Sequence, residues 1–151
     1  MKMTHKPISD AGLATALRIS VSRLARRLRA ERNVPGPAGD HLSDTQLAAL
    51  IALERHGPMT PGELADHEKV QPPSMTRVIS ALVEAGLVTR SAHPTDRRQV
   101  LLSVTEEGRE LVRQARRRRD EWLARRLAEL TPAERASLRV AAEILERVSQ
   151  A

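Results

Sequence analysis

Cysteine is absent from this chain of 151 residues. Without thiols the protein cannot form disulfides, bind zinc through cysteine, or use thiolate chemistry in catalysis or redox sensing. Aromatic residues are scarce as well, since Trp122 is accompanied by no phenylalanine or tyrosine. We therefore expect a core of aliphatic side chains, and a poor surface for stacking single-stranded nucleic acid.

Long apolar runs are also missing. No stretch of the sequence approaches the roughly 20 apolar residues that cross a membrane, and the first ten residues lack the apolar core of a secretion signal. We therefore expect a cytoplasmic protein with no membrane partner. The hydrophobic content of 40% and charged content of 29% indicate a folded chain, and its length suits a single domain.

Lysine is rare, with Lys2, Lys6 and Lys69 alone, so arginine supplies the other 22 of the 25 basic residues. The net charge is +6. A basic surface attracts phosphate backbones or anionic membranes, and the arginine fork matches phosphates and base edges through paired hydrogen bonds. A GC-rich coding bias would explain the same abundance of arginine without any role in binding.

Apolar spacing and capping signals predict six helices and one β-hairpin, a mainly α fold with a small β-hairpin wing (α+β). The first helix is expected over residues 8–32, followed by a loop at 33–41 with two prolines and two glycines. Ser43, Thr60 and Thr131 each begin a capping-box pattern and predict later helix starts. The fifth helix is expected to begin after Thr105 and to reach about residue 130.

A short helix ending near His67 is followed, after a four-residue turn, by a helix over residues 72–85. This spacing is typical of a helix-turn-helix, although an ordinary helical hairpin shares it. Met75, Ile79 and Leu82 give the second helix a buried face. Its opposite face carries small polar residues and one arginine, which would allow close approach to a duplex.

A hairpin follows, with strands expected at 87–91 and 99–105 and a polar turn that contains Asp96, Arg97 and Arg98. A helix followed by such a hairpin has the layout of a winged helix, which can place the helix in the major groove and an arginine in the minor groove. One interpretation is that the Asp96 carboxylate holds the Arg98 guanidinium extended. The other is that Asp96 closes an Asx-turn in a solvated loop.

Apolar stripes on the terminal helices exceed what a small central lobe can cover. We therefore expect the first, fifth and sixth helices to pack together and against a second copy, forming a homodimer with two-fold symmetry. The candidate dimerisation residues are Leu13, Leu17, Val21, Leu138, Leu145 and Val148.

The resemblance to one known family rests on four segments: Ser74-Met75-Thr76-Arg77, residues 82–88, Pro94-Thr95-Asp96-Arg97-Arg98 and residues 102–108. With the order of elements, they resemble the MarR family of bacterial transcriptional regulators over nearly the whole chain. The resemblance implies a winged helix-turn-helix lobe at residues 42–104, a dimerisation helix at 8–33 and C-terminal dimerisation helices at 105–151, all within a single domain. It also implies a homodimer that binds palindromic double-stranded DNA, often as a repressor.

The same resemblance assigns DNA-binding roles to individual positions. On the recognition helix and at its start these are Gln71, Pro73, Ser74, Thr76 and Arg77, and on the wing they are Asp96, Arg97 and Arg98. Many relatives release DNA when a small, often phenolic, effector binds between the lobe and the dimer region. Trp122 would suit a wall of that pocket, or would simply pack in the interior.

Other chemistry finds little support in the sequence. The five histidines form no tight pair of metal ligands, although Glu63 and His67 share a helix face, so we expect no metal and no cofactor. The run of four arginines at 116–119 is interpreted as a solvated helix face or as a contribution to the field around DNA. We expect no catalytic residues, because no nucleophile–base or phosphate-loop motif is present. A winged-helix module that binds protein rather than DNA is the alternative function.

Overall fold

A computed structural model describes residues 9–32, 35, 36, 39 and 41–151. Its six helices and one antiparallel hairpin confirm the mainly α fold with a small β wing. The expected start of the first helix at Ile8 lies outside the described residues. The elements are α1 (Asp10–Ala30), α2 (Asp44–His56), α3 (Pro61–Glu68), α4 (Pro72–Glu84), β1 (Val88–Ala92), β2 (Val100–Val104), α5 (Glu106–Ala128) and α6 (Pro132–Ser149).

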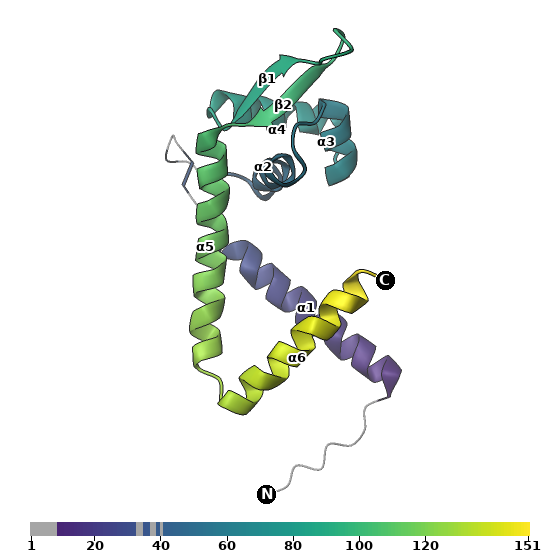
Figure 1. The fold of residues 1–151 in the computed structure, drawn as a ribbon, viewed down its shortest axis with the longest axis vertical. Helices are drawn as coiled ribbons and strands as arrows, with labels where there is room; N and C mark the ends of the chain where they lie inside the picture. Colours follow the sequence, from purple (N-terminus) through teal and green to yellow (C-terminus); the bar gives the residue numbers. More distant parts are fainter. Residues whose placement is uncertain (1–8, 33–34, 37–38, 40) are drawn as a thin grey trace, which may run out of the picture.

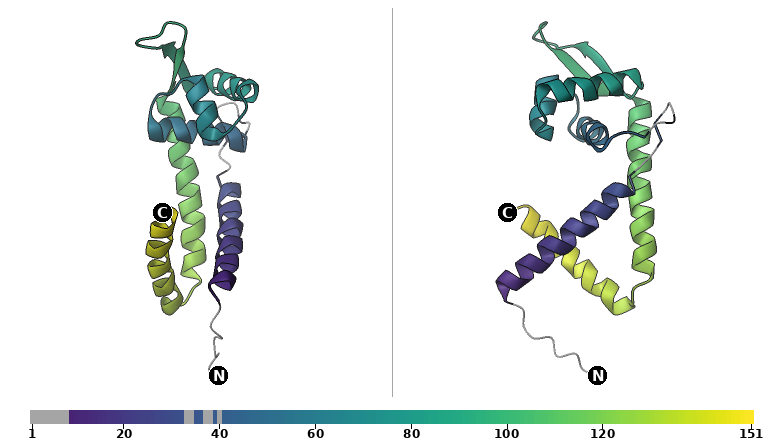
Figure 2. Two further views of the ribbon diagram at one scale, coloured as in Figure 1. Left: turned by 90° about the vertical axis from the view of Figure 1, so that its right-hand side faces the viewer. Right: turned by 180° about the vertical axis from the view of Figure 1, so that it is seen from behind.

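The elements form a compact lobe mounted on one long helix. Figure 1 shows α2, α3, α4 and the hairpin gathered at one end of α5, while α1 and α6 lie toward its other end. The two terminal helices extend to the same side of α5 and cross in that view, but the left view of Figure 2 shows that they lie apart from each other. Within one chain α1 contacts α5, with Arg27 over the Trp122 ring, but α1 and α6 do not lie against each other. A single chain therefore does not bring all three helices together as expected.

The helix starts follow local hydrogen bonding that the sequence predicts. Ser43, Thr60 and Thr131 each accept a hydrogen bond from the backbone amide three residues later. The side chain of the glutamine or glutamate at that later position accepts a hydrogen bond from the backbone amide of the cap residue. These reciprocal bonds satisfy amides that a helix start would otherwise leave unpaired. Helix ends differ from expectation by one or two residues, since Glu68 still belongs to α3 and α5 ends at Ala128.

The core of the lobe is aliphatic, as the lack of aromatic residues requires. The first half of α5 takes part in it, because Leu111, Val112 and Ala115 are buried with residues of the lobe. The expected boundary at residue 105 therefore does not separate lobe from dimerisation region. The largest fully buried side chains are Leu50, Leu53, Leu64, Met75, Leu82, Leu87, Val88, Leu102 and Val112.

The start of α5 is attached closely to the turn that follows α4. The Thr105 hydroxyl donates to the Gly86 carbonyl at 2.7 Å and accepts from the Gly108 amide at 3.1 Å. Gly86 has φ of 73°, the left-handed conformation expected after the helix. A Cβ at Gly108 would collide with the Leu87 carbonyl oxygen and lie 2.7 Å from the Val104 side chain. The absence of a side chain at this position therefore allows α5 to lie against the hairpin.

The hairpin is attached to the lobe at its base. Val88 pairs with Val104, and Ala92 pairs with Val100 at the outer end. Leu102 also exchanges two backbone bonds with Met59, in the segment between α2 and α3, at 2.8 and 3.2 Å. The base of the wing is thus held on both edges of β2, while the tip projects away from the lobe. Among the described residues, no helix is both long and apolar enough to cross a membrane.

Candidate nucleic-acid interface

The exposed face of α4 carries the predicted recognition residues. Gln71, Pro73, Ser74, Thr76 and Arg77 are all exposed, while Met75, Ile79 and Leu82 hold the helix in the core. The Thr76 hydroxyl donates to the Pro72 carbonyl at 3.0 Å, so its oxygen stays available as an acceptor. The buried face fixes the helix, and the polar face remains open to a ligand.

The start of α4 offers few backbone amides to a phosphate. Gln71 is the N-cap and makes no side-chain capping bond, and two prolines follow it. Because proline has no N–H, Ser74 carries the only donor among the first three helical positions. A phosphate approaching this helix end would therefore meet the Ser74 amide together with its hydroxyl.

The tip of the hairpin is held by local bonds from Asp96 and His93. The Asp96 carboxylate accepts from the backbone amide of Arg98 at 3.0 Å, which is an Asx-turn. The His93 Nδ1 accepts from the amides of Thr95 and Asp96 at 3.3 and 3.2 Å. The structure thus shows the Asx-turn, and it pairs Asp96 with the Arg98 backbone rather than with the guanidinium.

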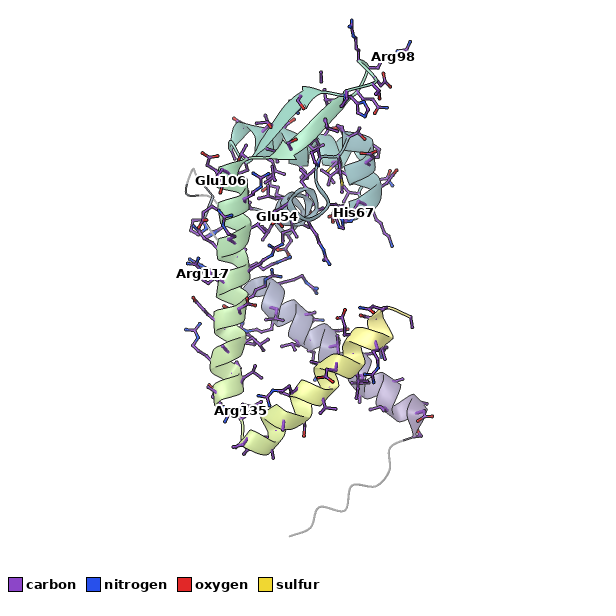
Figure 3. The ribbon with its side chains drawn as sticks, in the orientation of Figure 1. Glu54, His67, Arg98, Glu106, Arg117 and Arg135 are labelled. Atoms are coloured by element: carbon purple, nitrogen blue, oxygen red, sulfur yellow. The ribbon has the colours of Figure 1, made fainter. Side chains whose placement is uncertain are left out.

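Arg97 and Arg98 are exposed at this tip, and the Arg98 side chain points away from the lobe (Figure 3). Sequence reasoning missed His93, whose bonds to two successive amides shape the turn. The signal was a histidine placed two residues before Thr95 and three before Asp96, a spacing at which the ring can accept hydrogen bonds from their amides.

Trp122 lies in a different place from the one expected for an effector site. Its ring is flanked by the guanidinium carbons of Arg27 and Arg126, at 5.4 and 5.7 Å from the ring centre. The hollow beside it is lined by residues of α1 and the end of α5, with none from the lobe. Trp122 therefore joins α1 to α5 and does not border a space beneath the lobe.

A second cavity does lie between the lobe and the C-terminal end of α1, with a volume of about 270 Å³. Only 12% of the Arg32 side chain is exposed there, its Nε has no hydrogen-bond partner, and Asp44 is a distant partner at 3.8 Å. Burial lowers the pKa of Arg32, the charge of Asp44 partly offsets this effect, and the nearby charges of Arg119 and Arg29 lower the pKa further. The lining residues are Arg29, Ala30, Arg32, His41, Leu42, Asp44, Leu47 and Leu111.

The arginine run on α5 is more than a solvated face. Arg116 forms an ion pair with Glu54 of α2, with 2.7 Å between the nearest nitrogen and oxygen, and this contact links the lobe to α5.

The His56 and His67 rings lie with centres 4.8 Å apart, and His67 contacts Glu68 rather than Glu63. In the described part of the chain, no group of three or more residues is arranged to hold a metal ion.

The candidate dimerisation residues form exposed apolar faces. Neither α1 nor α6 buries a residue within the chain. The structure adds Leu24, Val140 and Ile144 to the residues expected there. The six expected ones are all exposed: Leu13, Leu17, Val21, Leu138, Leu145 and Val148.

Together, the exposed face of α4 and the adjoining arginine-tipped hairpin define a winged-helix DNA-binding protein. The chain belongs to the MarR family of transcriptional regulators, whose family model matches residues 42–100. As a member of this family, it is a DNA-binding regulator and not an enzyme.

Similar proteins agree with this assignment. An HTH-type transcriptional regulator of Mycobacterium tuberculosis is 54% identical over 137 residues, which cover 91% of this chain and 92% of the relative. An HTH-type transcriptional repressor of Bacillus subtilis, MdtR, is 27% identical over the full chain and 91% of its own length. The crystal structure of a transcriptional regulator from Pseudomonas aeruginosa has a TM-score of 0.79 and 34% identity, covering 97% of this chain and 99% of that one.

The two interpretations of Asp96 can be separated by substitution. An asparagine keeps an oxygen that accepts the Arg98 amide, whereas alanine removes it. We expect Asp96→Asn to retain DNA affinity, and Asp96→Ala to weaken it by about 1 kcal/mol through a disordered tip. Fluorescence anisotropy on a duplex selected by the wild type measures both. An equal loss in the two variants would show that the carboxylate charge, and not the turn, is what matters.

Proposed function

We propose that the protein is a ligand-responsive repressor that acts as a homodimer on a palindromic operator in the bacterial cytoplasm. The observation that carries this proposal is the joint exposure of the α4 polar face and the arginine tip on one side of a rigid lobe. A helix and a hairpin so arranged can occupy a major groove and the adjacent minor groove. The name of the Bacillus subtilis relative, a repressor, supports repression over activation.

Arg98 supplies the sharpest test of DNA binding. We expect Arg98→Ala to cost about 1–3 kcal/mol of operator affinity, because a guanidinium seated in a narrow minor groove would be lost. Binding is measured over a salt series on a duplex selected from a random pool. Arg135→Ala is the matched control, since Arg135 is exposed at the start of α6, far from the hairpin (Figure 3).

Two results would contradict the proposal. Unchanged affinity in Arg98→Ala would remove the wing contact. Weak, salt-insensitive binding by the wild type would favour the alternative of a module that binds protein, because phosphate contacts make DNA affinity fall steeply with salt.

The apolar faces of α1 and α6 support the homodimer. Side chains such as Leu13 at 48% exposure and Val148 at 67% are costly to leave in water, and they lie on helices that the rest of the chain does not cover. A second copy related by two-fold symmetry presents the same faces in return. Two lobes on such an axis would read two half-sites of a palindrome.

The dimer can be tested on the α1 face. We expect Leu17→Glu to weaken dimerisation by roughly 3 kcal/mol or more, because symmetry buries two uncompensated carboxylates. Thr15→Glu introduces the same charge on the opposite face of α1 and should leave the dimer intact. Sedimentation equilibrium over a dilution series measures the dissociation constant. Equal dimerisation of Leu17→Glu and the wild type would exclude this face as the interface.

The cavity beneath the lobe supports a small effector. Its largely buried Arg32 is 3.8 Å from Asp44 in a loose ion pair, and leucines supply apolar walls. These features suit a small molecule with an apolar body and an acidic or phenolic oxygen. Because residues of α1, α2 and α5 line the cavity, an occupant would bear on the angle between lobe and dimer region.

Benzoate and its neutral analogue benzamide are simple probes of this site. We expect millimolar benzoate to raise the melting temperature and to weaken operator binding, and benzamide to do neither, because only the carboxylate pairs with Arg32. Arg32→Gln should abolish the benzoate effects. Identical responses to the two probes, or a full response in Arg32→Gln, would show that Arg32 does not hold the effector.

A further inference from the structure

Arg90 links the wing to the recognition helix. It lies on β1, and its Nη2 donates to the hydroxyl of Ser80 on α4 at 3.3 Å. Both residues are exposed. Successive strand residues alternate between faces, so Arg90 lies on the same face of the hairpin as the buried Val88, just beyond the edge of the core. Its guanidinium therefore lies against the exposed side of α4 at the edge of the core.

This position is between the two predicted DNA-contacting elements. Ser80 follows Arg77 by three residues, so both belong to the exposed face of α4. Along the hairpin, Arg90 is two residues, or about 7 Å, from the end of β1 at Ala92, where the tip begins. The guanidinium therefore has the recognition face on one side and the arginine-bearing tip on the other.

In a bound duplex, a sugar–phosphate strand would pass this position between α4 and the hairpin tip. A major groove and the adjacent minor groove are separated by one sugar–phosphate strand. If α4 enters the first groove and the tip the second, that strand must cross the surface between them. Its phosphates carry the negative charge that a guanidinium binds most strongly, often through two parallel bonds.

The chemical state of Arg90 also suits an anion. Arginine has five N–H donors, and the Ser80 hydroxyl is a neutral acceptor that engages one nitrogen without cancelling the charge. The ion pairs of the described residues do not involve Arg90. By contrast, Arg116 is held by the carboxylate of Glu54. Ser80 therefore orients the side chain while its remaining donors stay free.

We propose that Arg90, oriented by Ser80, binds the phosphate strand that separates the two grooves. This inference rests on the proposed function and adds a contact without base specificity. Ser80 is a positioning residue in this scheme. The competing explanation is a structural brace, in which Arg90 only ties the hairpin to α4.

The test measures operator affinity over a salt series for the wild type, Arg90→Gln and the control Arg135→Gln, which removes the same charge far from the hairpin. We expect Arg90→Gln to weaken binding on the order of ten-fold and equally on selected and scrambled duplexes. The slope of log K against log salt should fall by about two, one for each protomer of the dimer. Arg135→Gln should retain the wild-type slope.

A double-mutant cycle tests the positioning role. Ser80→Ala alone should weaken binding a few-fold with nearly the full salt slope, because the charge remains. In the Arg90→Gln background it should have no further effect. Thermal unfolding of each variant shows whether the fold is retained.

The outcomes distinguish failure of the Arg90 phosphate contact from failure of the proposed function. If the wild type binds duplex DNA and Arg90→Gln keeps its salt slope, the phosphate contact is wrong and the proposed function stands. A lowered melting temperature with an unchanged slope identifies a brace. Failure of the wild type to bind any duplex overturns the proposed function and the phosphate contact together. Additive effects of the two substitutions would overturn the positioning role of Ser80.

Discussion

The junction between the lobe and α5 is the constraint on which the rest of the structure depends. Thr105 caps α5 and donates to the Gly86 carbonyl, while Gly108 lies against Leu87 with no space for a Cβ. These contacts set the direction in which α5 leaves the lobe. The Glu54–Arg116 ion pair adds a second point of attachment about two helical turns further along α5. Because α5 carries α6 and borders α1, the junction also determines where the apolar terminal faces lie.

The lobe presents its polar groups on elements of unequal rigidity. The face of α4 is supported by Met75, Ile79 and Leu82 in the core, so its side chains are held in register. The hairpin is fixed at its base by Met59 and Leu102 but projects freely at its tip, where only local bonds from His93 and Asp96 act. A firm helix and an adjustable tip suit a duplex whose minor groove varies in width with sequence.

Much of the fold could be predicted because its signals are local. Three capping boxes and the hairpin turn involve residues close in sequence, and the structure confirms each of them. The contacts of Trp122 with Arg27, of Arg116 with Glu54 and of Arg90 with Ser80 each join two different elements, over sequence separations from 10 to 95 residues. No periodicity reports such pairings, since they depend on how helices come together. The sequence left two interpretations of Asp96 open, because its spacing from Arg98 is compatible with a bond to either the amide or the guanidinium, and the structure shows the bond to the amide.

The sequence by itself determined the elements, the apolar faces and the family to which the chain belongs, because capping, periodicity and turn chemistry act over a few residues. The tertiary structure decided which of those faces remain uncovered, because it places α1 and α6 apart rather than against each other. It also decided that Arg32, and not Trp122, borders the cavity beneath the lobe. Burial and charge compensation depend on every neighbouring element, so these properties exist only once the chain has folded.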